Sequence, residues 1–276
     1  MVAPARLEVI VRRGSGDARR PPLLFVHGAG HGAWAWDEHF LEFFAAHGFD
    51  AYALSLRGHG ESPGRERLSR ASIADYVSDV HDVAAGVSDV PVVVGHSLGA
   101  RVAMKYLETH DAPAAALLAP LPRFGLLVSV ARTARDHPWL ATRALLAGKP
   151  GRLLGARQLA RQLYFSHELD EELVREYASR QGRESTLAMR QITYVQPDIA
   201  RVRARGVPLL VIGASADHFV RPTAVRRIAA SYGAEVKIVP SVAHCMMLDA
   251  RWRDVAGTLL EWLGQLPALS LAGDGL

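Results

Sequence analysis

The sequence of 276 residues contains one cysteine and only three lysines. A single cysteine, Cys245, cannot form an internal disulfide, and this composition fits a reducing compartment. The first twenty residues carry scattered arginines and lack the apolar stretch of about 7–15 residues that a signal peptide needs. No stretch approaches the roughly 18 apolar residues of a membrane span. We therefore expect a cytoplasmic protein with no membrane partner.

Arginine accounts for 29 of the 32 basic residues, and the net charge is +4. Nucleic-acid binding would require basic residues concentrated on one face within a recognisable module. The sequence contains no zinc-finger spacing, RNP motif or basic helix. We therefore expect a solvated basic surface and no nucleic-acid partner. The sequence indicates no particular oligomeric state.

Short aliphatic or β-branched segments alternate with longer segments of helical period. Most of the short segments are apolar throughout, as buried parallel strands are. This alternation predicts an α/β fold with a doubly wound, mostly parallel sheet. The expected strands are 7–11, 23–26, 51–54, 90–94, 114–118, 208–212 and 235–239, and the expected helices are 37–46, 73–87, 99–109, 222–231 and 250–263.

The alternation stops between residues 121 and 205. This segment is rich in Ala, Leu, Arg and Glu, has helical period at 140–146 and 170–181, and contains no convincing strand. It carries 15 basic and 8 acidic residues, a local excess of +7. We expect a helical cap, or lid, inserted after the strand that ends near Leu118. Residues 1–120 and 206–276 would then form the core domain.

The stretch PVVVGHSLGA, residues 91–100, has a glycine two residues before Ser97 and another two residues after it. A β-branched run precedes the serine and a helical segment follows it. This G-x-S-x-G pattern, between a strand and a helix, is typical of a nucleophile elbow rather than of an ordinary glycine-rich turn. The sharp turn strains the serine backbone, exposes its hydroxyl above the sheet, and needs glycines on both sides to relieve crowding.

A serine hydroxyl is a poor nucleophile unless a base removes its proton. With a nucleophile elbow, the partners follow in the chain order serine, then acid, then histidine. Asp217 comes just after one apolar strand and His244 just after the next. The carboxyl ends of strands form the edge of an open α/β sheet at which ligands bind. Order and position therefore predict a catalytic triad of Ser97, His244 and Asp217.

The stretch FVHGAGHGAW, residues 25–34, has two possible interpretations. Its glycines fit the dinucleotide fingerprint, in which backbone amides approach a pyrophosphate. That fingerprint also needs an acidic residue after the second strand, where this sequence has Ser55, Leu56 and Arg57. The turn can instead offer a backbone N–H to an oxyanion. We therefore expect no nucleotide cofactor and predict an oxyanion hole formed by the amides of Ala29 and Leu98.

Two further stretches, HGAGHGAWAW and FDAYALSLRGHGES, occupy residues 27–36 and 49–62. With the elbow, they resemble the α/β-hydrolase-fold proteins, and in particular the branch of plant methyl esterases, hydroxynitrile lyases and bacterial esterases and lactonases. The resemblance covers nearly the whole chain and implies the same triad and the same oxyanion donors. One departure is Ser55, where many relatives have Asp in the pattern D-x-R-G-x-G-x-S. That Asp is not a triad member, so its loss affects the turn more than the chemistry.

The predicted function is hydrolysis of a carboxylic ester of a small or medium-sized molecule through an acyl-enzyme, without a cofactor. A lactonase or thioesterase would share the chemistry, whereas a lyase or cyclase of this fold would use the triad differently. A third alternative is a binding module. In the similar hydroxynitrile lyases, Thr stands at the position of Gly28 and Lys at that of Cys245. Their absence here favours hydrolysis over cyanide release.

Gly28, Trp34 and Met246 are the residues that we expect in the substrate pocket. Packing beneath the cap would explain Trp34 equally well, and core packing would explain Met246. His27 and His31 are four residues apart, but the glycines between them disfavour a helical pair of metal ligands. We therefore expect no metal ion.

Overall fold

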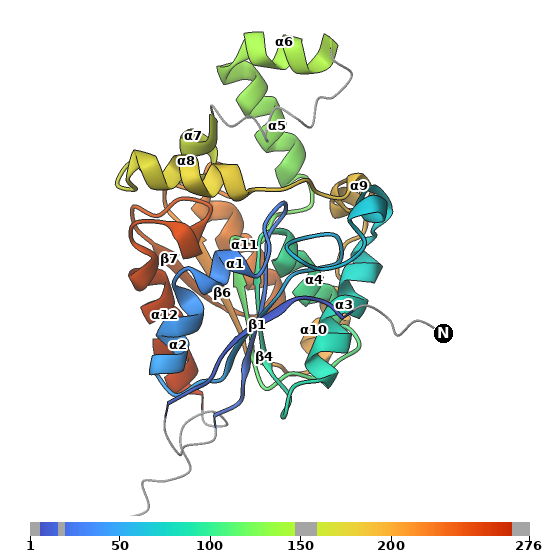
Figure 1. The fold of residues 1–276 in the computed structure, drawn as a ribbon, viewed down its shortest axis with the longest axis vertical. Coiled ribbons are helices and arrows are strands. Elements are labelled where there is room, and N and C mark those ends of the chain that lie inside the picture. The colour runs from blue at the N-terminus through green and yellow to red at the C-terminus, as the bar shows by residue number, and fades with distance from the viewer. Residues whose placement is uncertain (1–5, 16–19, 147–158, 267–276) are drawn as a thin grey trace, which may run out of the picture.

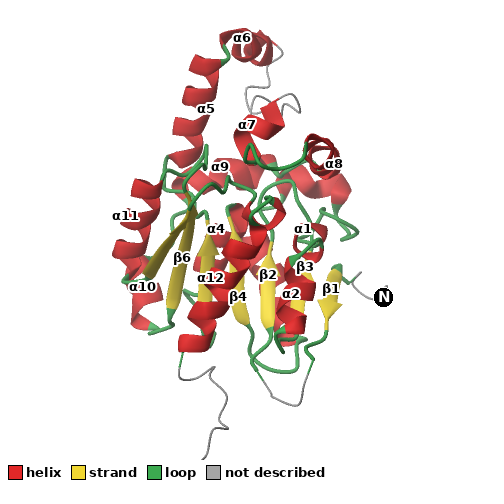
Figure 2. Ribbon diagram, turned by 90° about the vertical axis from the view of Figure 1, so that its left-hand side faces the viewer, coloured by secondary structure: helices red, strands yellow, loops and turns green. Residues whose placement is uncertain are grey.

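The computed structural model describes residues 6–15, 20–146 and 159–266. A seven-stranded sheet with helices on both faces forms its centre (Figures 1 and 2). The strand order is β1-β3-β2-β4-β5-β6-β7, and only the β1–β3 pair is antiparallel. The predicted doubly wound, mostly parallel α/β fold is confirmed. The strands are β1 (Val9–Arg12), β2 (Leu23–Val26), β3 (Ala51–Leu54), β4 (Val92–His96), β5 (Ala115–Leu118), β6 (Leu209–Ala214) and β7 (Glu235–Val239).

Strands β2 to β6 are buried along their whole length, as their apolar sequences predict. Successive strand residues face opposite sides of the sheet, so Leu24 and Phe25 belong to different hydrophobic clusters. Edge strand β7 is buried only in part. One face of the sheet carries α1 (Trp34–Asp37), α2 (Phe40–Ala46) and α12 (Trp252–Gln265), and the other carries α3 (Ile73–Ala85), α4 (Leu98–Tyr106) and α11 (Pro222–Tyr232).

The described part of the segment between β5 and β6 contains six α-helices and no strand. Helices α5 to α8 lie beyond the carboxyl edge of the sheet, whereas α10 packs against α11 at the level of the sheet (Figure 2). The periods at 140–146 and 170–181 correspond to α6 and α8, and residues 147–158 lie outside the described residues. The division into a core and a cap domain stays a prediction. The six helices are α5 (Gly125–Asp136), α6 (Pro138–Leu146), α7 (Ala160–Tyr164), α8 (Glu171–Arg180), α9 (Thr186–Tyr194) and α10 (Ile199–Ala204).

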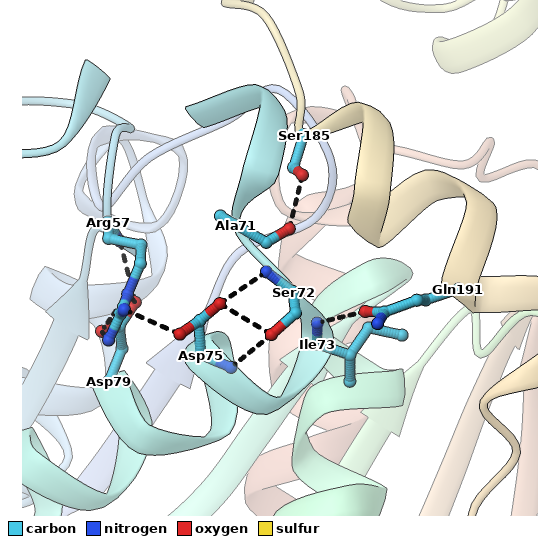
Figure 3. A network of polar contacts seen from close by, with 8 residues as sticks. All are labelled: Arg57, Ala71, Ser72, Ile73, Asp75, Asp79, Ser185 and Gln191. Carbon is cyan, nitrogen blue, oxygen red and sulfur yellow. Dashed lines mark hydrogen bonds and ion pairs between the residues drawn. The ribbon is translucent and has the colours of Figure 1, made fainter. Parts of the chain in front are cut away.

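Helix α9 is fastened to the beginning of α3 (Figure 3). The hydroxyl of Ser185 donates to the carbonyl of Ala71 at 2.5 Å, and the amide of Ile73 donates to the side chain of Gln191 at 2.7 Å. Next to these bonds, α3 begins with a capping box of Ser72 and Asp75. The N-terminus of α3 therefore has partners both within its own first turn and in the inserted segment.

Arg57 supports the same end of α3 (Figure 3). Its guanidinium lies 3.0 Å from the carboxylate of Asp75 and 2.7 Å from that of the buried Asp79. One arginine thus bridges two turns of the helix.

None of the helices in the described part of the chain combines the length and apolar character that a bilayer crossing requires.

Candidate active site

The turn between β4 and α4 holds Ser97 in a backbone conformation that residues other than glycine rarely adopt, with φ 53° and ψ −109°. A side chain at Gly95 would overlap the carbonyl of Gly99, and one at Gly99 would overlap the carbonyls of Val26 and His27. Both glycines are therefore required by close backbone contacts. The packing explains the G-x-S-x-G spacing, and the strained serine is the one that the motif predicts.

Ser97, His244 and Asp217 form a continuous chain of hydrogen bonds. The Nε2 atom of His244 lies 3.0 Å from Ser97 Oγ, and its Nδ1 atom lies 2.9 Å from Asp217 Oδ2. A carboxylate can only accept, so Nδ1 carries the proton and Nε2 is left as the acceptor for the hydroxyl. All three side chains are buried. The structure thus brings together the three residues of the predicted triad in the order that proton transfer needs.

Asp217 is fixed by the backbone that follows it. Its Oδ1 atom accepts hydrogen bonds from the amides of Phe219 at 2.6 Å and Val220 at 3.0 Å. These two bonds leave Oδ2 directed at His244. The loop after β6 therefore sets both the position and the orientation of the imidazole.

The loop that carries His244 is held by two further buried side chains. The Nε2 atom of His96 lies 2.9 Å from the carbonyl of His244, and burial lowers the pKa of His96 well below its usual value. Asp249 accepts from the amide of Ala243 at 3.2 Å and from the amide and hydroxyl of Ser166 at 3.0 and 2.8 Å. Asp249 thus connects this loop to the residues after α7. Neither His96 nor Asp249 takes the place of a triad member.

A cavity of about 70 Å³ lies directly at Ser97. Ala29 and Leu98 both line it, and neither amide has an acceptor among the described residues. The two donors predicted for the oxyanion hole therefore border the same space as the serine. The other lining residues are His31, His96, Leu121, Leu126, Tyr164, Met189, Ile192, Phe219 and His244.

The lining residues in the described part of the chain do not include Gly28, Trp34 or Met246. A side chain at Gly28 would lie 2.6 Å from Nδ1 of His96, so this glycine makes room for a buried histidine. The guanidinium of Arg180 lies over the indole ring of Trp34, and its central carbon is 4.1 Å from the centre of that ring. Met246 is fully buried in the hydrophobic core. The structure thus gives these three residues packing positions next to the site.

A second buried network lies behind the loop that carries Ala29. The carboxylate of Glu184 lies 3.1 Å from His59 Nε2 and accepts from the hydroxyl of Tyr76 at 2.6 Å and the amide of Gly30 at 3.1 Å. Burial alone would lower the pKa of His59, but the hydrogen bond and charge of Glu184 outweigh it and raise that pKa. Burial acts against ionisation of Glu184 too, yet the bond to His59 lowers its pKa. The pair is therefore ionic between about pH 4.5 and 6.5.

This network was not predicted from the sequence, and no local signal marks it. Glu184 is 125 residues from His59 and 108 from Tyr76 in the chain. A backbone bond from Gly182 to the carbonyl of Gly30, at 2.7 Å, joins the same two segments. Residues 182–184 therefore clamp the loop after β2 from the side of the inserted helices.

The histidines of that loop are uncharged near neutral pH. Burial lowers the pKa of His27 to about 3 and that of His31 to about 4.

In the described parts of the chain, no three His, Cys, Asp or Glu side chains are grouped so that they could hold a metal ion. Burial also raises the pKa of the Cys245 thiol well above its usual value, which disfavours the thiolate that a second nucleophile would need.

A family model described as the Alpha/beta hydrolase family matches residues 23–258. Among curated relatives, "Protein phosphatase methylesterase 1" of Bos taurus is 33% identical over 96 residues, and "Probable esterase PIR7A" of Oryza sativa subsp. indica is 36% identical over 108 residues. The matches cover 34% and 37% of this chain, and 25% and 40% of the respective relatives. The chain thus matches less than half of the length of either relative.

Solved structures with the same fold cover nearly the whole chain. A thermophilic esterase from Thermogutta terrifontis has a TM-score of 0.70 at 18% identity, covering 96% of both chains. The enol-lactonase from Burkholderia xenovorans LB400 has a TM-score of 0.70 at 16% identity, covering 94% of this chain and 96% of its own. At such low identity these similarities establish the fold alone.

Proposed function

Because the chain belongs to the alpha/beta hydrolase family, we propose that it is a serine hydrolase that cleaves a carboxylic ester of a small or medium-sized molecule. One observation carries the proposal: a strained serine at the end of a central strand is hydrogen-bonded to a histidine, which is itself hydrogen-bonded to a carboxylate. The names of the relatives, an esterase and a methylesterase, support the same class of bond.

In the proposed mechanism His244 takes the proton of Ser97 as the hydroxyl attacks the ester carbonyl. His244 then gives this proton to the leaving alcohol, and an acyl-enzyme remains. Water repeats the sequence on the acyl-enzyme with His244 again as the base. Asp217 keeps the imidazole in the required tautomer and stabilises its positive charge. These steps move only protons and an acyl group, so they require no cofactor.

The amides of Ala29 and Leu98 would hold the oxyanion of the tetrahedral intermediate. Both border the cavity at Ser97 and have no acceptor among the described residues, so they are available to the developing charge. Removing one such donor from a hydrolase lowers kcat by about 10²–10³-fold. The inserted helices 121–205 would form the lid over this site. A cytoplasmic location and a small-molecule ester as the partner stay predictions.

The test combines covalent labelling with turnover. We expect a fluorophosphonate probe to label Ser97, as mass spectrometry of the digested protein would show, and we expect hydrolysis of p-nitrophenyl acetate. Ser97→Ala should fold normally and lose both reactions, whereas Ser179→Ala, at an exposed serine of α8, should keep both. Turnover by Ser97→Ala at the wild-type rate would refute the proposal. Labelling of Ser97 without cleavage of any ester, thioester or lactone would instead favour a lyase or cyclase.

A further inference from the structure

A groove of about 640 Å³ lies beside the cavity at Ser97 and is bordered by α4, α5, α11 and the residues before α10. Its lining contains no acidic residue in the described part of the chain. It does contain five arginines, from four different segments, and none of them has a carboxylate within 4.0 Å among the described residues. The five are Arg101, Arg123, Arg132, Arg221 and Arg227.

Arg101 lies at the inner end of this group and is only 2% exposed. Its guanidinium donates to the side chain of Gln196 at 2.7 Å and to the carbonyl of Leu121 at 3.0 Å, while its Nε atom has no partner among the described residues. Burial lowers its pKa. A buried cation whose partners are all neutral is costly, and a bound anion would offset that cost.

Arg132 extends the positive charge toward the catalytic residues. Its guanidinium donates to the carbonyl of His218, next to Asp217, and its Nε atom also lacks a partner among the described residues. Burial and the neighbouring charge of Arg221 lower its pKa, and the charges of Asp217 and Asp136 offset this only in part. Arg132 and Arg221 both line the groove, and its described lining contains no acidic residue, so their charges favour an anion there.

Between the arginines, part of the groove wall is apolar and faces solvent. Phe124, Val128 and Ile199 are 52%, 60% and 39% exposed, although side chains of this size usually favour the interior. An inorganic ion would leave these walls uncovered. A ligand that combines an apolar body with an anionic group would cover the walls and pair with the arginines.

The groove and the cavity at Ser97 share two lining residues, Leu121 and Phe219. The ring of Phe219 lies 4.5 Å from the ring of His244, centre to centre. The cavity of about 70 Å³ has room for a reacting ester group but not for a whole ligand, since small-molecule pockets measure about 300–1,000 Å³. The groove has that size, and Leu121 and Phe219 border both spaces.

We infer that this groove binds the anionic part of the substrate, and that the substrate class is an ester with a carboxylate or phosphate on an apolar body. The inference rests on the proposed function, because the bound anion is a substrate only if the protein hydrolyses esters. The ester group would lie at Ser97, the apolar body would pass Leu121 and Phe219, and the anionic end would meet the arginines.

The kinetic test uses three p-nitrophenyl esters of equal chain length: octanoate, the half-ester of suberic acid, and an ester with a terminal phosphate. We expect kcat/KM to be about tenfold higher for the two anionic esters than for octanoate. The double variant Arg221→Gln/Arg227→Gln removes two exposed charges. In it this preference should fall about tenfold, because KM for the anionic esters rises. Arg226→Gln is the matched control, because Arg226 lies on the same helix, is exposed and does not line the groove.

Equal kcat/KM for charged and neutral esters, unchanged in the double variant, would overturn the inference while leaving the hydrolase function intact. A preference for only one of the two anionic esters would support the inference and identify the anion as carboxylate or phosphate. A loss of the preference in Arg226→Gln as large as in the double variant would also overturn it, since general surface charge would then explain the effect.

A binding experiment separates this inference from the proposed function. Ser97→Ala should bind octyl phosphate and monomethyl suberate in calorimetric titrations. Binding should weaken at 0.5 M salt, and also when Arg221→Gln and Arg227→Gln are added to the Ser97→Ala protein. Methyl octanoate should bind more weakly than either. Salt-sensitive binding without hydrolysis of any ester by the wild-type protein would refute the hydrolase function and keep the anion site. Failure of both anions to bind would refute the anion site alone.

Discussion

Replacing Glu184 with glutamine removes a buried negative charge while keeping the shape of the side chain. The carboxylate accepts from Tyr76, Gly30 and the amide of Ser185, and it forms an ion pair with His59. Glutamine has one acceptor oxygen and turns a donor group toward some of these donors. At least one buried hydrogen bond is lost, and the charge of His59 is left without its partner.

The loss of stability can be estimated from these contacts. Removing one partner of a buried ion pair costs about 3–5 kcal/mol, but His59 can lower this cost by releasing its proton. We therefore expect the free energy of unfolding to fall by about 3 kcal/mol near pH 6. As pH rises through the folded-state pKa of His59, this histidine becomes neutral in the wild type too, and the difference should shrink to the roughly 1 kcal/mol of a lost hydrogen bond.

The direction of the pH dependence follows from the two pKa shifts. The pKa of His59 is raised above 6.5, so its contribution is fully present below pH 6.5 and is lost as pH rises through its folded-state value. The pKa of Glu184 is lowered below 4.5, so its contribution is present above pH 4.5 and is lost as pH falls through its folded-state value. The ion pair is therefore strongest between about pH 4.5 and 6.5.

Urea unfolding of the wild type and Glu184→Gln at pH 6 and pH 9 measures this effect. Glu172→Gln, at an exposed position of α8, is the control and should match the wild type at both pH values. Because the network holds Gly30 next to the Ala29 amide, kcat of Glu184→Gln for an ester should also fall, by about tenfold, with KM nearly unchanged. A difference in stability of equal size at pH 6 and pH 9 would refute an ionic pair.

Three further substitutions test the remaining contacts. Asp217→Asn should lower kcat by about 10⁴-fold while the protein stays folded, which ester hydrolysis and circular dichroism would measure. Asp249→Asn should instead reduce the free energy of unfolding by about 1–3 kcal/mol, because the Asp249 carboxylate accepts three hydrogen bonds from Ser166 and Ala243. Its kcat should change far less. A stable Asp249→Asn protein with very low kcat would contradict the assignment of Asp217 as the acid. Gly28→Ala should cost about 1–3 kcal/mol by pressing on His96, and thermal unfolding indistinguishable from the wild type would show that this contact can relax.

Most of the strands could be predicted because each is an apolar run that the sheet buries. The largest error is in β4, expected at 90–94 and observed at Val92–His96. Gly95 and His96 are not typical strand residues, yet both pair with β5. The nucleophile elbow requires a strand that continues up to Ser97, and this tertiary requirement outweighs local preference.

The helices of the inserted segment were harder to predict. Helix α5 was not predicted as a separate helix, because its buried positions, Gly125, Ser129 and Thr133, are small or polar while the apolar Leu127 and Val128 are exposed, the reverse of the usual pattern. Helix α1 has only four residues and follows a glycine-rich turn. The positions of Ser97, Asp217 and His244 could be predicted because each lies in the loop that follows the carboxyl end of a strand. The pocket could not, because part of its lining, Leu126, Tyr164, Met189 and Ile192, comes from inserted helices whose packing one sequence does not specify.

The contacts of Glu184, Ser185 and Gln191 mean that the segment between β5 and β6 is not an interchangeable module. Its own side chains complete the ion pair of His59, the hydrogen bonds at the start of α3 and the support of the Ala29 loop. A chimera whose segment lacked an acidic residue at this position would leave the buried His59 without its counter-ion. Transplanting a new specificity into this protein therefore requires at least that residues 182–191 stay in place.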